Sequence, residues 1–284
     1  MLGEKLTDSD IDRFHLDGAI CIRDGVPAVL VALLRRAISK WLIDEHSNVN
    51  LVREHAGASS LRVAMNLWSR SPLFEKVAFD AGLASIAARL LGSREVFLFN
   101  DNLFVKDAGA NVPLDWHNDL PYYPIDGTML LTLWLPVDHV DLWSGGLRYV
   151  AGSHGWGQRY RPVHFTPGSG TYDLPFPVAP DIENAIDTYR ILTWDVLPGD
   201  VIAHHGLTLH SSGPNRSSHQ RRALALRFAG DDITWAPRAN TLVVAEDPGL
   251  TPGDRIGGPS FPRVWPAATA ATDMRSGFPP SRRT

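Results

Sequence analysis

The sequence has little cysteine, little lysine and no long apolar run. Cys21 is the only cysteine among 284 residues, which excludes an intrachain disulfide and a metal cluster held by thiolates. The longest apolar run, around residues 26–34, is too short to span a bilayer, and the first ten residues lack the apolar core of a signal peptide. We therefore expect a cytoplasmic protein in which any metal site uses His, Asp or Glu side chains.

The overall composition is that of a globular protein without a strongly charged surface. Hydrophobic residues make up 44% of the chain and charged residues 20%, and the formal net charge is -4. Lysine is rare among the 27 basic residues, most of which are arginine. The slightly acidic balance argues against nucleic acid or an anionic membrane as the main partner, so a small molecule is the expected one. Residues 1–284 are expected to form a single domain.

The first third of the chain, residues 1–94, has mostly helical patterning. Residues 6–17 have helical spacing with Thr7 or Asp8 as N-cap and Gly18 as a natural stop. Residues 19–22 are expected to form a short strand, and Pro27 opens an amphipathic helix that runs to about Ile43. A second helical region is expected over residues 73–91.

From residue 95 onwards the pattern changes to short strands separated by Gly and Pro. Strands are expected at 96–106, 128–135, 147–150, 190–194, 200–205 and 222–228. This pattern predicts a mainly β protein, a sandwich or barrel over residues 95–232, with the N-terminal helices covering one face. Residues 157–188 are rich in Pro, Gly and aromatics and are interpreted as a lid, and residues 233–284 as a Pro/Gly-rich extension.

One short stretch, DWHNDLPYY at residues 115–123, suggests a metal site. It contains His117 and Asp119, and residues i and i+2 share one face of a strand. The pair alone is weak evidence, because about one His-x-acid pair is expected by chance and the chain contains three. The other two begin at His15, near the end of a helix where the two side chains diverge, and at His139.

A later hairpin-like stretch supplies a third ligand. Turn signals at Pro198–Asp200 and Ser212–Asn215 flank two short strands, which places His210 at a strand edge and an arginine on the next strand. Two imidazoles and a carboxylate suit a non-haem Fe(II) oxygenase. They would equally suit a zinc hydrolase, although the helical His-Glu-x-x-His spacing is missing and the arginine would then have no role.

Several motifs in order resemble one known family. These are His117-x-Asp119, Trp134 in a following strand, the turn AGSH at 151–154, His210 in HSSGPN, and Arg221 eleven positions later. In this combination the chain resembles the phytanoyl-CoA dioxygenase family of Fe(II)- and 2-oxoglutarate-dependent oxygenases. The resemblance implies a double-stranded β-helix core, which is a cupin-like jelly roll.

The resemblance also implies roles for individual residues. His117, Asp119 and His210 would hold Fe(II), leaving positions for 2-oxoglutarate and O2. Arg221 would bind the distal carboxylate of 2-oxoglutarate, and Ser212 would add a hydrogen bond. The remaining expected pocket residues are Trp134, Lys106 and Asn102. The alternatives are a surface arginine, a turn serine and a core tryptophan. His139, His154 and the pair His204-His205 are expected to be structural or to support the ligands rather than to bind metal.

The activity implied is hydroxylation of an unactivated C–H bond, coupled to conversion of 2-oxoglutarate to succinate and CO2. A small metabolite or natural product is favoured as substrate over an acyl-CoA, and desaturation, epimerisation or cyclisation stay open. A non-catalytic binding protein on the same scaffold is a further alternative. Aromatic residues could line a substrate pocket or simply belong to the core: Trp116, Tyr122, Tyr123, Trp143, Trp156, Tyr160 and Phe165.

Overall fold

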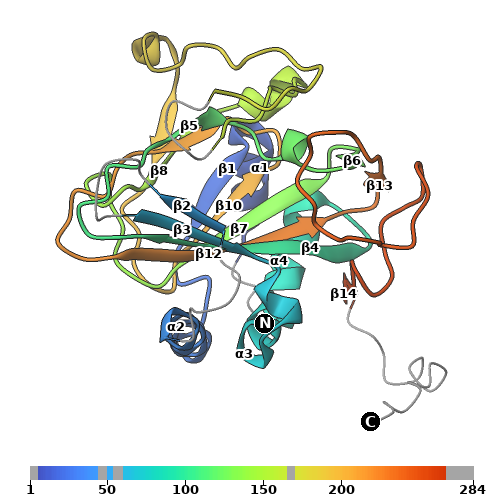
Figure 1. The fold of residues 1–284 in the computed structure, drawn as a ribbon, viewed down its shortest axis with the longest axis horizontal. Coiled ribbons are helices and arrows are strands. Elements are labelled where there is room, and N and C mark those ends of the chain that lie inside the picture. Colours follow the sequence, from blue (N-terminus) through green and yellow to red (C-terminus); the bar gives the residue numbers. More distant parts are fainter. Residues whose placement is uncertain (1–5, 44–49, 54–59, 165–169, 267–284) are drawn as a thin grey trace.

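A computed structural model of the chain describes residues 6–43, 50–53, 60–164 and 170–266 (Figure 1). The described residues of the N-terminal third form the α-helices α1 (Asp8–Asp17), α2 (Ala28–Ile43), α3 (Pro72–Ala78) and α4 (Ala81–Leu91). Short 3-10 helices are η2 (Leu67–Ser69), η3 (Leu120–Tyr122), η4 (Ser153–Trp156) and η5 (Ile186–Thr188). No helix of the described residues combines the length and apolar character that a membrane crossing requires.

Two antiparallel sheets form the body of the protein. The larger sheet has the order β1-β10-β7-β12-β4-β3-β2, with β14 also paired to β4, and the smaller has the order β5-β11-β8-β9. The larger sheet contains β1 (Ala19–Ile22), β2 (Asn50–Arg53), β3 (Ser60–Met65), β4 (Val96–Lys106), β7 (Leu130–Pro136), β10 (Val201–His205), β12 (Arg221–Ala229) and β14 (Arg263–Trp265). The smaller contains β5 (Leu114–His117), β8 (Leu147–Val150), β9 (Ile191–Thr193) and β11 (His210–Ser212). A separate pair is formed by β6 (Ile125–Asp126) and β13 (Thr234–Trp235).

The pleat of the larger sheet divides its side chains between two cores. On β12, Leu224, Leu226 and Phe228 belong to the core that α2, α3 and α4 cover, whereas Ala223 and Ala225 belong to the core beneath the smaller sheet. The helices therefore lie on one face and the smaller sheet on the other, as Figure 1 shows. The predicted class, mainly β with N-terminal helices around a jelly-roll core, is confirmed.

The element predictions were right for most of the strands and incomplete in the helical third. Strands β1, β4 and β8 have the expected bounds. The expected helical region 73–91 is two helices, because Asp80 leaves the helical conformation and its carboxylate caps α4 by accepting from Gly82 N and Leu83 N. Residues 1–94 also contribute β2 and β3 to the larger sheet, and β14 of the C-terminal extension pairs with β4.

Gly18 connects the first helix to the sheet that carries the site. It ends α1 with φ 76°, and its carbonyl accepts hydrogen bonds from His205 N and from the Thr208 hydroxyl. A Cβ at this position would lie 2.5 Å from the Thr208 hydroxyl and would also overlap the His154 ring. Gly92 ends α4 with a similar φ of 62°, but a Cβ there would meet nothing within 4 Å.

These two glycines make a matched test of close packing at the junction of α1 and β1. We expect Gly92→Ala to lower the free energy of unfolding by about 1–2 kcal/mol, the cost of the left-handed conformation. Gly18→Ala should cost roughly 1–3 kcal/mol more, because of the added overlap. Denaturant unfolding of both variants measures the difference, and equal losses would show that the junction has room to adjust.

Candidate metal centre

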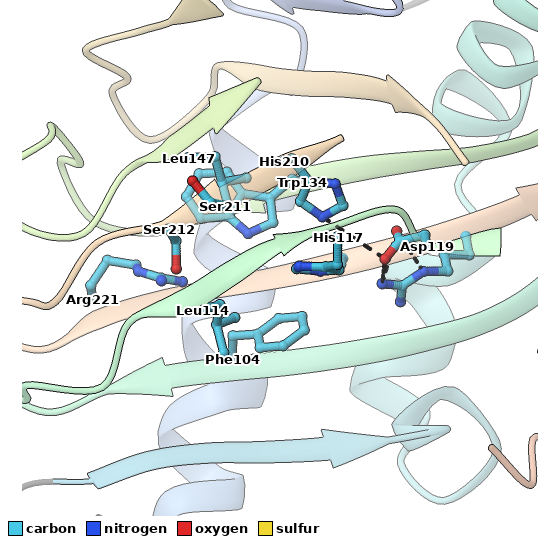
Figure 2. A pocket seen from close by; sticks show the side chains of 12 residues that line it. Phe104, Leu114, His117, Asp119, Trp134, Leu147, His210, Ser211, Ser212 and Arg221 are labelled. Carbon is cyan, nitrogen blue, oxygen red and sulfur yellow. Dashed lines mark hydrogen bonds and ion pairs between the residues drawn. The ribbon is translucent and has the colours of Figure 1, made fainter. Parts of the chain in front are cut away.

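Three side chains converge between the two sheets. His117 ends β5 and His210 begins β11, and the two residues are paired across the antiparallel strands with ring centroids 4.3 Å apart. Asp119 follows two residues after His117, at the start of η3. One donor atom from each of His117, Asp119 and His210 lies within 4.8 Å of the others, and all three residues are buried. Figure 2 shows the three side chains facing one another.

Each imidazole is held so that its Nε2 is available to a metal. Nδ1 of His117 lies 2.6 Å from Asp115 O, and Nδ1 of His210 lies 3.0 Å from Thr208 O. A carbonyl oxygen only accepts, so each Nδ1 carries the proton and each Nε2 carries a lone pair. Burial lowers the pKa of His117 to about 3 and that of His210 to about 4, so both rings are neutral at pH 7.

The carboxylate of Asp119 is held by three neighbouring side chains. Oδ2 accepts from the Thr132 hydroxyl (2.9 Å), from His204 Nε2 (3.3 Å) and from Arg227 Nε (3.1 Å). Oδ1 accepts from Arg227 Nη2 (3.1 Å) and lies 3.9 Å from His210 Nε2. Burial by itself would raise the pKa of Asp119, but Arg227, His204 and His210 lower it well below its ordinary value. The group is therefore an ionised, oriented carboxylate with Oδ1 toward His210.

Arg227 is a site residue that the sequence reasoning missed. It lies on β12 six positions after Arg221, so the two arginines share the face of the strand that carries Ala223 and Ala225. Its guanidinium is also 5.4 Å from the centre of the Tyr123 ring. The even spacing from Arg221 within one strand is the sequence signal that would have identified it.

A cavity extends from the three ligands to Arg221. It is lined by Phe104, Leu114, His117, Asp119, Trp134, Leu147, His210, Ser211, Ser212, Arg221, Ala225 and Arg227. Figure 2 shows Arg221 and Ser212 on one side of the view and Asp119 on the other. The cavity therefore has an ionic group at each end and apolar side chains between them.

The guanidinium of Arg221 has no carboxylate partner among the described residues. The side chain is 2% exposed, its Nε has no hydrogen-bond partner in the described part of the chain, and Cζ lies 5.6 Å from the centre of the Trp134 ring. Burial lowers its pKa to about 10, so it stays charged at neutral pH. Arg222, on the opposite face, pairs with Asp138 through two nitrogens. The buried charge of Arg221 is thus available to an anion in the cavity.

Lys106 and Asn102 were both predicted to line the pocket, and neither is among the residues that do. Lys106 Nζ donates to Ser212 Oγ (2.8 Å) and to Gly213 O (2.6 Å), and burial together with Arg221 lowers its pKa well below the ordinary value. Because Ser212 Oγ accepts this bond, its own proton is free to be donated into the cavity. Asn102 is buried farther along β4, where its Oδ1 accepts from Asn100.

The aromatic residues expected around the substrate belong mostly to the core. Trp116, Tyr122, Tyr123 and Tyr160 are buried in apolar clusters, whereas Trp143 is 60% exposed and lies against Arg216. None of them is among the residues that line the cavity between the three side chains and Arg221, and Phe165 lies outside the described residues. Burial in these clusters favours the core alternative for Trp116, Tyr122, Tyr123 and Tyr160, because the strands and loops around β5 and η3 need apolar side chains to close their own core. A substrate role for the aromatic residues stays a prediction.

Residues 157–188 are attached to the turn that carries the ligands. Asn118, between His117 and Asp119, donates to Gln158 O (2.9 Å) and accepts from Tyr160 N (3.3 Å). The Tyr122 hydroxyl donates to Val163 O (2.8 Å) and accepts from Val163 N (3.0 Å). The lid interpretation of residues 157–188 stays a prediction, but the beginning of this segment is anchored beside the three ligands.

His15, His139, His154, His204 and His205 lie in structural positions. His15 Nε2 contacts Leu90 O, His154 Nε2 contacts His15 O, and His139 pairs with Asp195 at the surface. His204 supports Asp119, and His205 Nδ1 accepts from Leu207 N. The Asp17 carboxylate is bound by Arg190.

The buried histidines make the metal-free protein sensitive to acid. Burial lowers the pKa of His117 to about 3 and of His205 and His210 to about 4, so below pH 6.5 the unfolded chain binds protons that the folded chain excludes. Their contribution to stability is complete above pH 6.5 and is lost as the pH falls toward 4. We expect the thermal midpoint of metal-free protein to fall over this range, and less steeply in His205→Gln. A thermal midpoint that stays constant between pH 6.5 and 4 would show that the buried rings can be protonated without loss of stability.

The amino-acid sequence is similar to that of known oxygenases. The family model described as Phytanoyl-CoA dioxygenase (PhyH) matches residues 14–223. A probable alpha-ketoglutarate-dependent hypophosphite dioxygenase of Stutzerimonas stutzeri is 31% identical over 125 residues, which is 43% of this chain and 42% of that protein. Ectoine dioxygenase of Sphingopyxis alaskensis is 26% identical over 243 residues, 81% of this chain and 72% of that protein.

Other relatives agree on the fold. Phytanoyl-CoA dioxygenase 1 of Oryza sativa subsp. japonica is 27% identical over 58% of this chain, and the match spans 56% of that protein. The chain therefore spans only about half the length of the hypophosphite dioxygenase and of the rice enzyme. The crystal structure of the non-heme alpha ketoglutarate dependent carbocyclase SnoK from nogalamycin biosynthesis has a TM-score of 0.73 at 21% identity, covering 92% of this chain and 97% of that one. Since the family model spans most of the chain, the protein belongs to the phytanoyl-CoA dioxygenase family of Fe(II)- and 2-oxoglutarate-dependent oxygenases.

Proposed function

We propose that this protein is an Fe(II)- and 2-oxoglutarate-dependent dioxygenase that hydroxylates a C–H bond of a small metabolite or natural product. The observation that supports this most directly is a single cavity with two kinds of site. At one end the donor atoms of His117, Asp119 and His210 lie within 4.8 Å of one another. At the other end Arg221 has a buried charge, with no carboxylate partner in the part of the chain that the structure describes. A metal and a dicarboxylic co-substrate match these two ends.

The donor set fits iron, and the protein groups around it prepare the site for it. His117, Asp119 and His210 would hold Fe(II), which supplies the redox chemistry for splitting O2. A zinc hydrolase would use the same three ligands but would leave Arg221 without a function. The buried hydrogen bonds on each Nδ1 and on Asp119 Oδ2 fix the three donor atoms, so little rearrangement is needed when the metal binds.

The far end of the cavity fits the distal carboxylate of 2-oxoglutarate. The planar guanidinium of Arg221 would take its oxygens in a forked pair, and the Ser212 hydroxyl, oriented by Lys106, would donate a further hydrogen bond. Between the two ends, Trp134, Phe104, Leu114 and Leu147 would cover the carbon chain and exclude water. Of the predicted co-substrate residues, Arg221, Ser212 and Trp134 keep direct roles, Lys106 acts through Ser212, and Asn102 has no contact that supports a role.

The proposed overall reaction consumes one substrate, one 2-oxoglutarate and one O2. One oxygen atom enters the substrate C–H bond as hydroxyl and the other enters succinate, with release of CO2. The family resemblance favours hydroxylation over halogenation because the carboxylate ligand Asp119 is present. A carbocyclase and an epimerase are among the structures with the same fold, and so cyclisation and epimerisation remain alternatives to hydroxylation.

A small metabolite is the preferred substrate class, with an acyl-CoA as the second candidate. The ectoine and hypophosphite dioxygenases are relatives whose names give small substrates, and the ectoine enzyme aligns with 81% of this chain. The rice and Arabidopsis thaliana phytanoyl-CoA dioxygenases align with 58% and 62% of it and support the acyl-CoA alternative. A non-catalytic binder is the least supported, since it would have no need of an intact ligand set.

An anaerobic titration tests the proposed function. Adding Fe(II) and then 2-oxoglutarate to metal-free protein should produce the metal-to-ligand charge-transfer band of a chelated 2-oxo acid, because the three ligands leave positions open to it. His210→Ala should lose the band. A wild-type protein that binds Fe(II) and 2-oxoglutarate without the band would overturn the oxygenase assignment and favour a binding protein.

Arg221 and its neighbour Arg222 provide a matched pair for the co-substrate. Arg221→Ala should raise the 2-oxoglutarate concentration needed for half-maximal band formation roughly 10- to 100-fold, since hydrogen bonds to charged groups contribute about 1.5–3 kcal/mol. Arg222→Ala removes an arginine from the opposite face, where it pairs with Asp138, and should leave the requirement nearly unchanged. If both variants behave like wild type, another residue binds the distal carboxylate.

A further inference from the structure

Arg227 has a donor that the support of Asp119 does not use. The side chain is 4% exposed and lines the cavity with the three ligands. Its Nε and Nη2 edge bonds to Asp119, whereas Nη1 has no hydrogen-bond partner in the described part of the chain. Because the guanidinium is planar and two of its nitrogens are fixed, the direction of Nη1 is fixed as well.

A second unpartnered polar atom lies on the neighbouring strand. Asn100 on β4 is the register partner of Arg227 on β12, so the two side chains are adjacent on the same face of the sheet. Asn100 is fully buried, and its Oδ1 has no partner among the described residues while its Nδ2 donates to Asn102 and Tyr123. Two buried polar atoms without partners on paired residues are uncommon in a folded protein.

The charge of Arg227 also exceeds what the proposed cofactors require. With both imidazoles neutral, Fe(II), Asp119, 2-oxoglutarate and Arg221 carry no net charge together. Arg227 adds one buried positive charge, and no other ionised acid is among the residues lining the cavity. Burying an uncompensated charge is unfavourable, so a further single negative charge would be accommodated in this cavity.

We propose that Arg227 binds an anionic group of the primary substrate, so that the substrate class is a small singly charged oxyanion such as a carboxylate. This inference rests on the proposed function, because it takes the other positions of the cavity to be filled by Fe(II) and 2-oxoglutarate. Nη1 donates to the anion, because Arg227 is the member of the pair that lines the cavity, whereas Asn100 is not among the lining residues. The anion is thereby held next to the carboxylate ligand Asp119, which places the attached C–H bonds near the metal.

Acetate and acetamide, which have nearly the same shape, test whether the subsite selects for charge. Each is titrated at constant ionic strength into anaerobic protein saturated with Fe(II) and 2-oxoglutarate, and the charge-transfer band is followed. We expect acetate to perturb the band saturably and acetamide to bind at least about tenfold more weakly, because a charge-assisted hydrogen bond is lost. No saturable effect of acetate, or equal effects of the two, would overturn the proposal.

Variants of two arginines on β12 assign the effect to one residue. Arg227→Gln removes the charge and should weaken acetate at least about tenfold relative to Arg227→Lys, which keeps the charge, when each variant is measured at its own saturating concentrations of Fe(II) and 2-oxoglutarate. Arg222→Gln, on the opposite face, should bind acetate like wild type. If Arg227→Gln binds acetate with the same affinity as wild type, the anion binds at another residue.

A second measurement keeps the test independent of the cofactors. Arg221→Ala removes the other buried arginine charge of the cavity. In this background the thermal midpoint of metal-free protein should rise with acetate more than with acetamide, and this difference should vanish when Arg227→Gln is added but persist when Arg227→Lys is added. If wild type forms no charge-transfer band at all, the proposed oxygenase function fails, and this thermal difference then decides separately whether Arg227 is an anion site. No thermal difference in the Arg221→Ala background would count against the site.

Discussion

The ion pair between Asp119 and Arg227 is the interaction on which the candidate site depends. Both side chains are about 5% exposed and lie between two sheets, where each charge alone would cost several kcal/mol. The guanidinium meets the carboxylate through two nitrogens, and Thr132 and His204 satisfy the rest of Oδ2. The carboxylate can therefore remain ionised in an apolar interior and still offer Oδ1 to a metal.

The strand β12, which carries Arg227, also organises the rest of the cavity. One face of β12 presents leucine and phenylalanine to the helices, and the other presents Arg221, two alanines and Arg227 to the interior. The small side chains of the two alanines leave space between Arg221 and Arg227. Trp134 lies on β7, where it is the register partner of Ala225, and it borders that space. A single pleated strand thus separates two positive charges by a neutral gap, which suits two separate anions.

The elements and site residues that the sequence could predict are those determined by neighbouring residues or by ordered motifs. The strands β4 and β8 and the position of Gly18 follow from alternation and turn chemistry, and ordered motifs identified His117, Asp119, His210 and Arg221. The break at Asp80 is a capping effect inside an otherwise helical pattern. The partner of Asp119, the role of Lys106 through Ser212, and the burial of Tyr122 and Tyr123 depend on contacts between distant segments, which periodicity does not encode.

The turn between β5 and η3 connects the ligands to residues 157–188. Asn118 is bonded to Gln158 and Tyr160, and Tyr122 is bonded in both directions to Val163, so four hydrogen bonds join the two segments on either side of Asp119. Insertions or deletions between Gln158 and Val163 would disturb the ligand geometry, whereas residues after Val163 are not constrained by these bonds. Sequence changes in residues 157–188 are therefore least costly to the geometry of His117 and Asp119 when they fall beyond Val163.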